Sequence, residues 1–185
     1  DYRGRGGSQY DRYWRNYIPF IELIDTLDFM TLQDLHEAAI IGTSRGGIIA
    51  MMMAAVRPTA MGVVVLNDIG PVIEATGLAR IMGYVGRTRV PRSWEDAAHL
   101  LREMNERAFP AIEPWQWEEI ARAVFNEGRN GKPAQSYDRK LARAFGALGR
   151  KQPDLWPQFI ALGQFPALVI RGANSDLLSG ETVET

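Results

Sequence analysis

Short apolar runs separated by a helical pattern organise the first seventy residues of the chain. Residues 38–41 have the length and apolarity of a strand buried on both faces, and the β-branched run 61–66 reads as the next parallel strand. Residues 45–56 between them contain no proline and favour a helix that ends before Pro58. A third buried strand is predicted at 166–172. This order predicts an α/β fold with a parallel sheet.

Between Pro71 and Gly163 the sequence no longer predicts strands, and residues typical of helix starts and ends predict helices instead. A start resembling a capping box at Ser93–Asp96 opens the first of these segments. Helices are predicted at 93–109, 114–128 and 136–148, with a short element at 154–162. We therefore predict a helical cap over residues 71–163 and a sheet core over residues 1–70 and 164–185.

The pentapeptide Gly42-Thr43-Ser44-Arg45-Gly46 stands between the first predicted strand and its helix. This is the nucleophile-elbow pattern, in which a serine sits on a sharp turn and glycines two residues away leave room for the close backbone approach. A right-handed crossover places such a turn at the carboxyl edge of the sheet, where open α/β folds carry their sites. Ser44 is therefore the candidate nucleophile.

Composition narrows the function classes. The 185 residues include 21 basic and 22 acidic side chains, so neither nucleic acid nor an anionic membrane is an expected partner. Cysteine is absent and histidine occurs twice, which argues against a disulfide framework, a cysteine nucleophile and a protein-bound zinc. No apolar run approaches the roughly 20 residues that span a bilayer, and no leader pattern opens the chain. We expect a cytoplasmic protein without metal or cofactor.

Three motifs together resemble the α/β-hydrolase superfamily over nearly the whole chain. Residues 1–8 are similar to the D-x-R-G-x-G-x-S segment after the fourth strand of that fold, and residues 42–46 to the elbow after the fifth. Residues 172–176 resemble the turn after the seventh strand. The resemblance implies a partial α/β-hydrolase sheet with a helical cap insertion. It also implies an internal fragment that lacks the first strands and the region of the catalytic histidine.

The resemblance implies a role for each matching residue. Asp176 takes the place of the triad acid, Asp68 at the end of the second predicted strand is the alternative acid, and the backbone amide of Arg45 is an oxyanion donor. The Arg45 side chain is expected to face outward. His36 and His99 do not match the motif position of the base, and we expect both at the surface.

The function implied is a serine hydrolase that cleaves a small-molecule ester or related acyl compound through an acyl-enzyme at Ser44. Carbon–carbon bond hydrolysis and perhydrolysis on the same site remain alternatives, as does an inert fragment or ligand-binding scaffold. The oligomeric state is left open. Four tryptophans of the predicted cap either line an acyl pocket or form the core of the cap: Trp94, Trp115, Trp117 and Trp156.

Overall fold

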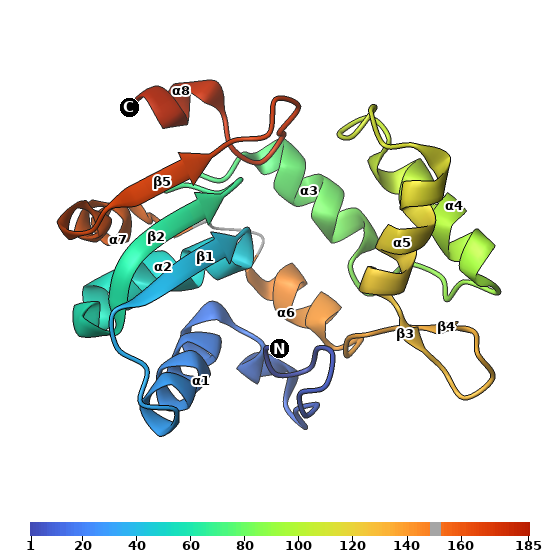
Figure 1. Ribbon diagram of the computed structural model, residues 1–185, viewed down its shortest axis with the longest axis horizontal. Coiled ribbons are helices and arrows are strands. Elements are labelled where there is room, and N and C mark those ends of the chain that lie inside the picture. The colour runs from blue at the N-terminus through green and yellow to red at the C-terminus, as the bar shows by residue number, and fades with distance from the viewer. Residues whose placement is uncertain (149–152) are drawn as a thin grey trace.

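A three-stranded parallel sheet with the order β1-β2-β5 forms the centre of the computed structural model, which describes residues 1–148 and 153–185 (Figure 1). The strands are β1 (Ala38–Thr43), β2 (Met61–Asn67) and β5 (Ala167–Ile170). All three agree with the predicted strands. Thr43 pairs with Asn67, and Asn67 pairs with Ile170, so the carboxyl ends of the strands lie level with one another.

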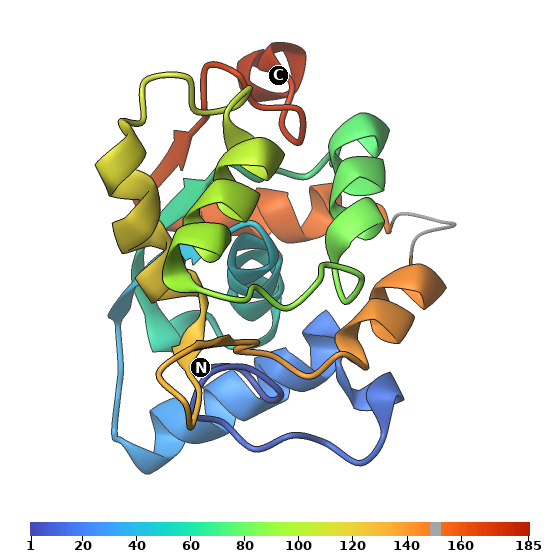
Figure 2. The same ribbon diagram turned by 90° about the vertical axis from the view of Figure 1, so that its right-hand side faces the viewer.

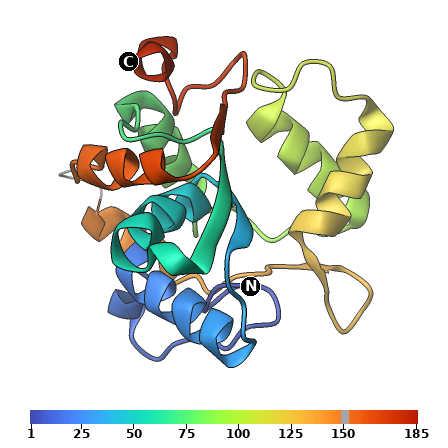
Figure 3. The same cartoon turned by 60° about the vertical axis from the view of Figure 1, so that its left-hand side comes forward.

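One face of the sheet carries the main core. Helix α2 (Arg45–Val56), at its predicted position, packs on β1 and β2, and it contacts both α1 (Pro19–Leu32) and α7 (Trp156–Ile160). Figure 3 shows these three helices on one side of the strands. Helix α2 is apolar almost throughout, and most of its residues between Gly47 and Ala54 are buried, whereas Val56 at its end is exposed. Its buried side chains form the core together with residues of the sheet and α1: Leu23, Met30, Ile49, Met51, Met53, Val64 and Leu66.

The second face of the sheet is uncovered within the described residues. Ile41 is 74% exposed and Leu168 is 55% exposed, so the prediction that residues 38–41 are buried on both faces is wrong for this chain. The reason lies in how the nearby helices pack. Helices α4 (Trp94–Asn105) and α5 (Pro114–Val124) bury their apolar sides against each other around Trp117 and not against the strands.

The remaining helices stand over the carboxyl ends of the strands. In Figure 1 the arrowheads of β1, β2 and β5 point toward α3 (Ala75–Tyr84), α4, α5 and α6 (Leu141–Leu148). Figure 2 shows the same helices in front of the sheet. The smaller elements are α8 (Gly180–Glu184), the β-ribbon of β3 (Asn126–Glu127) and β4 (Pro133–Ala134), and the 3₁₀ turns Trp14–Asn16, Pro58–Ala60 and Ala161–Gln164.

The helix starts follow their capping residues. The Ser93 side chain accepts a hydrogen bond from the Asp96 amide at 3.1 Å, as the capping pattern predicts. Helix α6 begins at Leu141, later than the predicted start at 136, because the Asp138 carboxylate accepts a hydrogen bond from the Lys140 amide and holds a turn there.

The division of the chain into a sheet core and a helical cap stays a prediction. Leu155 and Leu162, both inside the predicted cap range, pack in the main core.

Among the described residues, no helix combines the length and the apolar character needed to cross a bilayer.

Candidate active site

Ser44 occupies the turn between β1 and α2 with φ of +50° and ψ of −117°. Residues other than glycine rarely adopt this left-handed backbone conformation, and holding it costs about 1–3 kcal/mol. Hydrogen bonds on both sides keep the turn closed. The Ser44 amide donates to the Asn67 carbonyl at 3.2 Å, and the Ser44 carbonyl accepts from the Gly47 amide at 2.9 Å. The sequence prediction of a sharp strand-to-helix bend is therefore matched by the backbone.

Glycine at position 42 allows β1 and α2 to approach each other at this turn. A Cβ atom built on Gly42 would lie 2.6 Å from the Gly47 Cα and 2.7 Å from its nitrogen. These are backbone atoms, which cannot rotate away as a side chain would. The start of α2 would have to move for any larger residue to fit.

Gly42→Ala is expected to lower the free energy of unfolding by about 2–3 kcal/mol, because overpacking against backbone forces α2 away from β1. Urea denaturation measures the change. Gly83→Ala is the matched control, since a Cβ there meets nothing within 4 Å at a position inside α3. Alanine favours a helix over glycine by up to about 1 kcal/mol, so the control should be neutral or stabilised. Equal midpoints for Gly42→Ala and wild type would contradict the close approach.

An open cavity of about 860 Å³ lies in front of Ser44. Its floor is the elbow itself, Thr43 to Gly46, and one wall is the N-terminal loop with Tyr2 and Arg5. The opposite walls come from the helices over the strand ends, through apolar residues that include Leu101, Met104, Val124, Phe125, Leu141 and Phe145. A mostly apolar hollow with a few polar groups is typical of a small-molecule site. None of the four tryptophans of the predicted cap lines it, and Trp117 is buried in the contact between α4 and α5.

Tyr2 is a cavity residue that the sequence analysis did not single out. A Cβ built on Gly46 would lie 3.5 Å from the Tyr2 hydroxyl oxygen, which places that hydroxyl next to the elbow. Burial, with a smaller contribution from the Glu22 carboxylate, raises the pKa of Tyr2 above its ordinary value. The hydroxyl therefore keeps its proton at neutral pH and is a hydrogen-bond donor in the cavity. The only sequence signal for it was its place in the D-x-R-G motif.

Arg45 is the first residue of α2, so its amide has no acceptor one turn earlier in the helix. That geometry fits the predicted oxyanion donor. The expectation that its side chain faces outward is wrong. The side chain is only 13% exposed and pairs with the Glu22 carboxylate, because that buried carboxylate on α1 requires a cationic partner.

Asp68 lies beside the elbow. It follows Asn67, which pairs with Thr43, so Asp68 and Ser44 leave neighbouring strands at the same edge. The Asp68 backbone is also left-handed, with φ of +55°. Its carboxylate accepts one hydrogen bond from the Gly172 amide and one from the Ser175 hydroxyl, each at 3.0 Å. The turn after β5 therefore holds this carboxylate in place.

Asp176 is held by a different element. Its carboxylate forms a two-pronged ion pair with Arg80 of α3, at 2.6 and 2.8 Å. The hydrogen bond from the Arg80 guanidinium is the main cause that lowers the pKa of Asp176 below its usual range. Neither Asp176 nor Asp68 is among the residues that line the Ser44 cavity. The structure thus brings Asp68 next to the elbow and ties the other candidate acid to the helix above it.

Both histidines lie where the sequence analysis expected them. The His36 side chain is 60% exposed and lies 3.0 Å from Asp34, and the His99 side chain is 67% exposed and lies 3.4 Å from Glu103 on α4. Neither lines the cavity. Across residues 1–148 and 153–185, no group of three or more histidine, aspartate or glutamate side chains is arranged to hold a metal ion.

The sheet order, the crossover through α2 and the strained serine between β1 and α2 are those of an α/β-hydrolase core, so the chain has the α/β-hydrolase fold. Among solved structures it is similar to an α/β hydrolase from Novosphingobium aromaticivorans, with a TM-score of 0.93 and 37% identity over 100% of this chain and 65% of the other. A hydrolase assigned as putative from Rickettsia typhi shares the fold at a TM-score of 0.86 and 24% identity, over 100% of this chain and 62% of its own.

A curated relative supports the same grouping. The chain is 30% identical to a 3-hydroxybutyrate-oligomer hydrolase from Cupriavidus necator, over 99% of this chain and 64% of that protein. The chain thus spans slightly less than two thirds of the length of these relatives. No protein-family model matches it.

Proposed function

We propose that the protein is a serine hydrolase that cleaves an ester or related acyl compound through an acyl-enzyme on Ser44. The observation that carries the proposal is the strained backbone of Ser44 on a strand-to-helix turn, at a position that lines a largely apolar cavity. A core packing role would not require a left-handed serine. The hydrolase descriptions of the relatives support the same reading.

In the proposed reaction the Ser44 hydroxyl oxygen attacks the carbonyl carbon of the ester while a base takes the hydroxyl proton. Negative charge develops on the carbonyl oxygen, and the Arg45 amide at the start of α2 donates a hydrogen bond to it. The carbon–oxygen bond to the alcohol then breaks, and the alcohol leaves with the proton. Water attacks the acyl-enzyme in the same way and releases the acid and the free serine.

We assign the role of triad acid to Asp68 in preference to Asp176. Asp68 leaves the strand next to Ser44 and is oriented by the Gly172 amide and the Ser175 hydroxyl. Both oxygens of each carboxylate accept hydrogen bonds, but the donors to Asp68 are neutral groups, whereas the donor to Asp176 is the Arg80 guanidinium. A carboxylate whose charge is already paired with a guanidinium stabilises a protonated base less well. His36 and His99 are at the surface, so the proposal assigns the base to a histidine that these 185 residues do not supply.

The substrate class follows from the cavity and the curated relative. The relative from Cupriavidus necator is described as acting on 3-hydroxybutyrate oligomers, in which hydroxy-acid units are joined by ester bonds. The cavity that Ser44 lines is largely apolar, and Arg5, Asn126 and Gln135 are among its polar lining residues. We therefore propose a short hydroxy-acid ester as the substrate.

A fluorophosphonate probe tests the nucleophile directly, because it reacts with activated serine hydroxyls. The protein, purified with the chain segment or partner that supplies the histidine, should be labelled on Ser44, as read by mass spectrometry of the peptide, and should hydrolyse the dimer and trimer of 3-hydroxybutyrate. Labelling without turnover of any ester, amide or thioester in a substrate panel would favour a ligand-binding scaffold. Labelling equal in wild type and Ser44→Ala would end the serine-hydrolase proposal.

A further inference from the structure

Glu22 is a fully buried carboxylate inside helix α1. Burying a charge is costly unless partners replace the lost water. Two guanidinium groups do so here. Arg5 of the N-terminal loop lies 3.0 Å from one carboxylate oxygen, and Arg45 of the elbow binds the other. Three segments far apart in the sequence therefore meet on a single side chain.

The Arg45 guanidinium is held on several sides. Beside its contact with Glu22, it donates a hydrogen bond to the Tyr17 carbonyl at 2.7 Å and lies over the Phe145 ring, 5.4 Å from the ring centre. A guanidinium with a fixed fork of donors fits such a set of partners, whereas an ammonium group would satisfy only part of it. The side chain of the first α2 residue is thus anchored to α1 and to the loop before it.

We propose that Glu22 is a positioning residue for the nucleophile elbow, acting through Arg45. This inference rests on the proposed function, in which Ser44 attacks and the Arg45 amide receives the negative charge. Backbone strain such as that at Ser44 persists only where the surroundings over-determine the conformation. Glu22 supplies one such restraint on the residue directly after the serine. The bond from Glu22 to Arg5 extends the restraint to the wall of the cavity.

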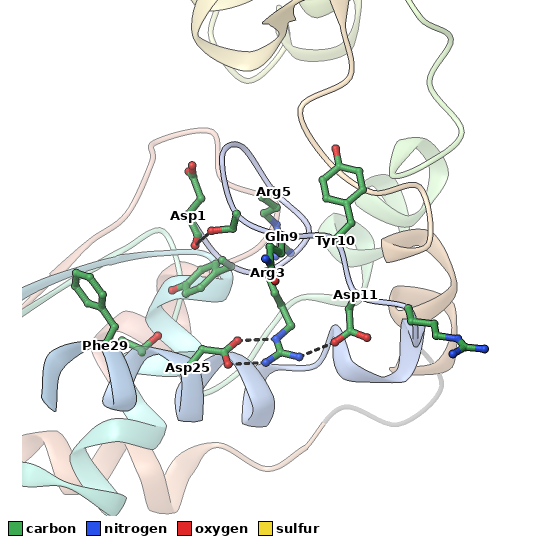
Figure 4. Close-up of a pocket in the computed structure, with 12 residues that line it drawn as sticks. Asp1, Arg3, Arg5, Gln9, Tyr10, Asp11, Asp25 and Phe29 are labelled. Atoms are coloured by element: carbon green, nitrogen blue, oxygen red, sulfur yellow. Dashed lines mark hydrogen bonds and ion pairs between the residues drawn. The ribbon is translucent and has the colours of Figure 1, made fainter. Parts of the chain in front are cut away.

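A second ion pair on the same helix provides a matched control. Arg3 of the same loop donates to the Asp25 carboxylate, with 2.6 Å from its Nε, and also pairs with Asp11 (Figure 4). These residues line a second hollow, which shares Asp1, Tyr2 and Arg5 with the Ser44 cavity but does not include Ser44. Asp25 therefore ties the same loop to the same helix as Glu22 does, but its carboxylate binds Arg3 and not the elbow.

The test compares Glu22→Gln with Asp25→Asn, two changes from carboxylate to amide on one helix. Glu22→Gln should lower kcat by about 30-fold or more while KM changes less than threefold, because misplacing a reacting group by about 1 Å costs up to 10²-fold. Asp25→Asn should keep kcat within twofold of wild type. Arg45→Lys retains the backbone amide but loses the forked donors of the guanidinium, so it should show the same kcat loss. It is the variant to use if Glu22→Gln fails to fold.

Hydrogen exchange separates this inference from the proposed function. The amides of residues 45–48 should exchange at least tenfold faster in Glu22→Gln or Arg45→Lys than in Asp25→Asn, whether or not the protein turns over an ester. Equal exchange at the elbow in all variants, or a kcat loss matched by Asp25→Asn, would overturn the positioning role. Faster exchange at the elbow without any wild-type hydrolysis or fluorophosphonate labelling would retain the anchor and reject the serine-hydrolase proposal.

Discussion

Ser44→Ala is expected to lower kcat for a 3-hydroxybutyrate dimer by about 10⁴-fold or more, because the acyl-enzyme cannot form without the hydroxyl. The binding groups of the cavity remain, so KM should change little. The alanine methyl group fits the space of the serine side chain, and Ser44 lines an open cavity and is not part of the main core, so the change removes no core packing. The protein should therefore fold as wild type does, which circular dichroism and the thermal midpoint will show.

Ser8→Ala is the control for this change. Ser8 lies in the N-terminal loop, donates to the Asp1 carbonyl and does not line the Ser44 cavity. It should retain wild-type kcat. A Ser44→Ala protein that still turns over the dimer at more than a hundredth of the wild-type rate would show that another group is the nucleophile.

Asp68→Asn is expected to lower kcat by about 10³ to 10⁴-fold, the scale seen when a triad carboxylate becomes an amide and the base adopts the wrong tautomer. The Gly172 amide can still donate to the asparagine oxygen, whereas the Ser175 hydroxyl faces the new NH₂ group and must accept from it, so the turn after β5 should survive with one hydrogen bond reversed. The kinetic loss is then a loss of orientation of the base and not of folding. Steady-state kinetics together with urea denaturation distinguish the two.

Asp176→Asn is the matched change at the other candidate acid. It breaks the ion pair with Arg80, in which the two side chains are 37% and 39% exposed, so its effect on stability should stay below about 1 kcal/mol. We expect its kcat to fall less than tenfold. The opposite order of effects, with Asp176→Asn the more damaging change, would assign the triad acid to Asp176 and reject the assignment to Asp68.

The elbow was readable from the sequence because its determinants are local. A strand, a helix and two glycines around a serine lie within twenty residues, and the clash that excludes a side chain at Gly42 arises between neighbours in the chain. The two exposed histidines were likewise readable, since His99 shares its face of α4 with charged residues.

The contacts of Glu22 with Arg5 and Arg45 could not be predicted from the sequence. Glu22 precedes Thr26 by four residues and Met30 by eight, so this spacing places it on the inner face of α1. The spacing does not indicate which cationic side chain pairs with the Glu22 carboxylate. The sequence alone predicts that the Arg45 side chain faces outward, because this is the commoner orientation of an arginine. Its burial depends on α1, Tyr17 and Phe145, which are brought together only by the fold.

The sequence by itself therefore determined the order of the central strands and helix, the bend at Ser44 and the helical character of the segment after β2, because each depends on periodicity and backbone sterics over a few residues. Only the tertiary structure decided which aspartate lies beside the serine, which face of the sheet is covered and where the Arg45 side chain goes. These outcomes depend on contacts between residues more than twenty positions apart, and such contacts leave no periodic trace in the chain.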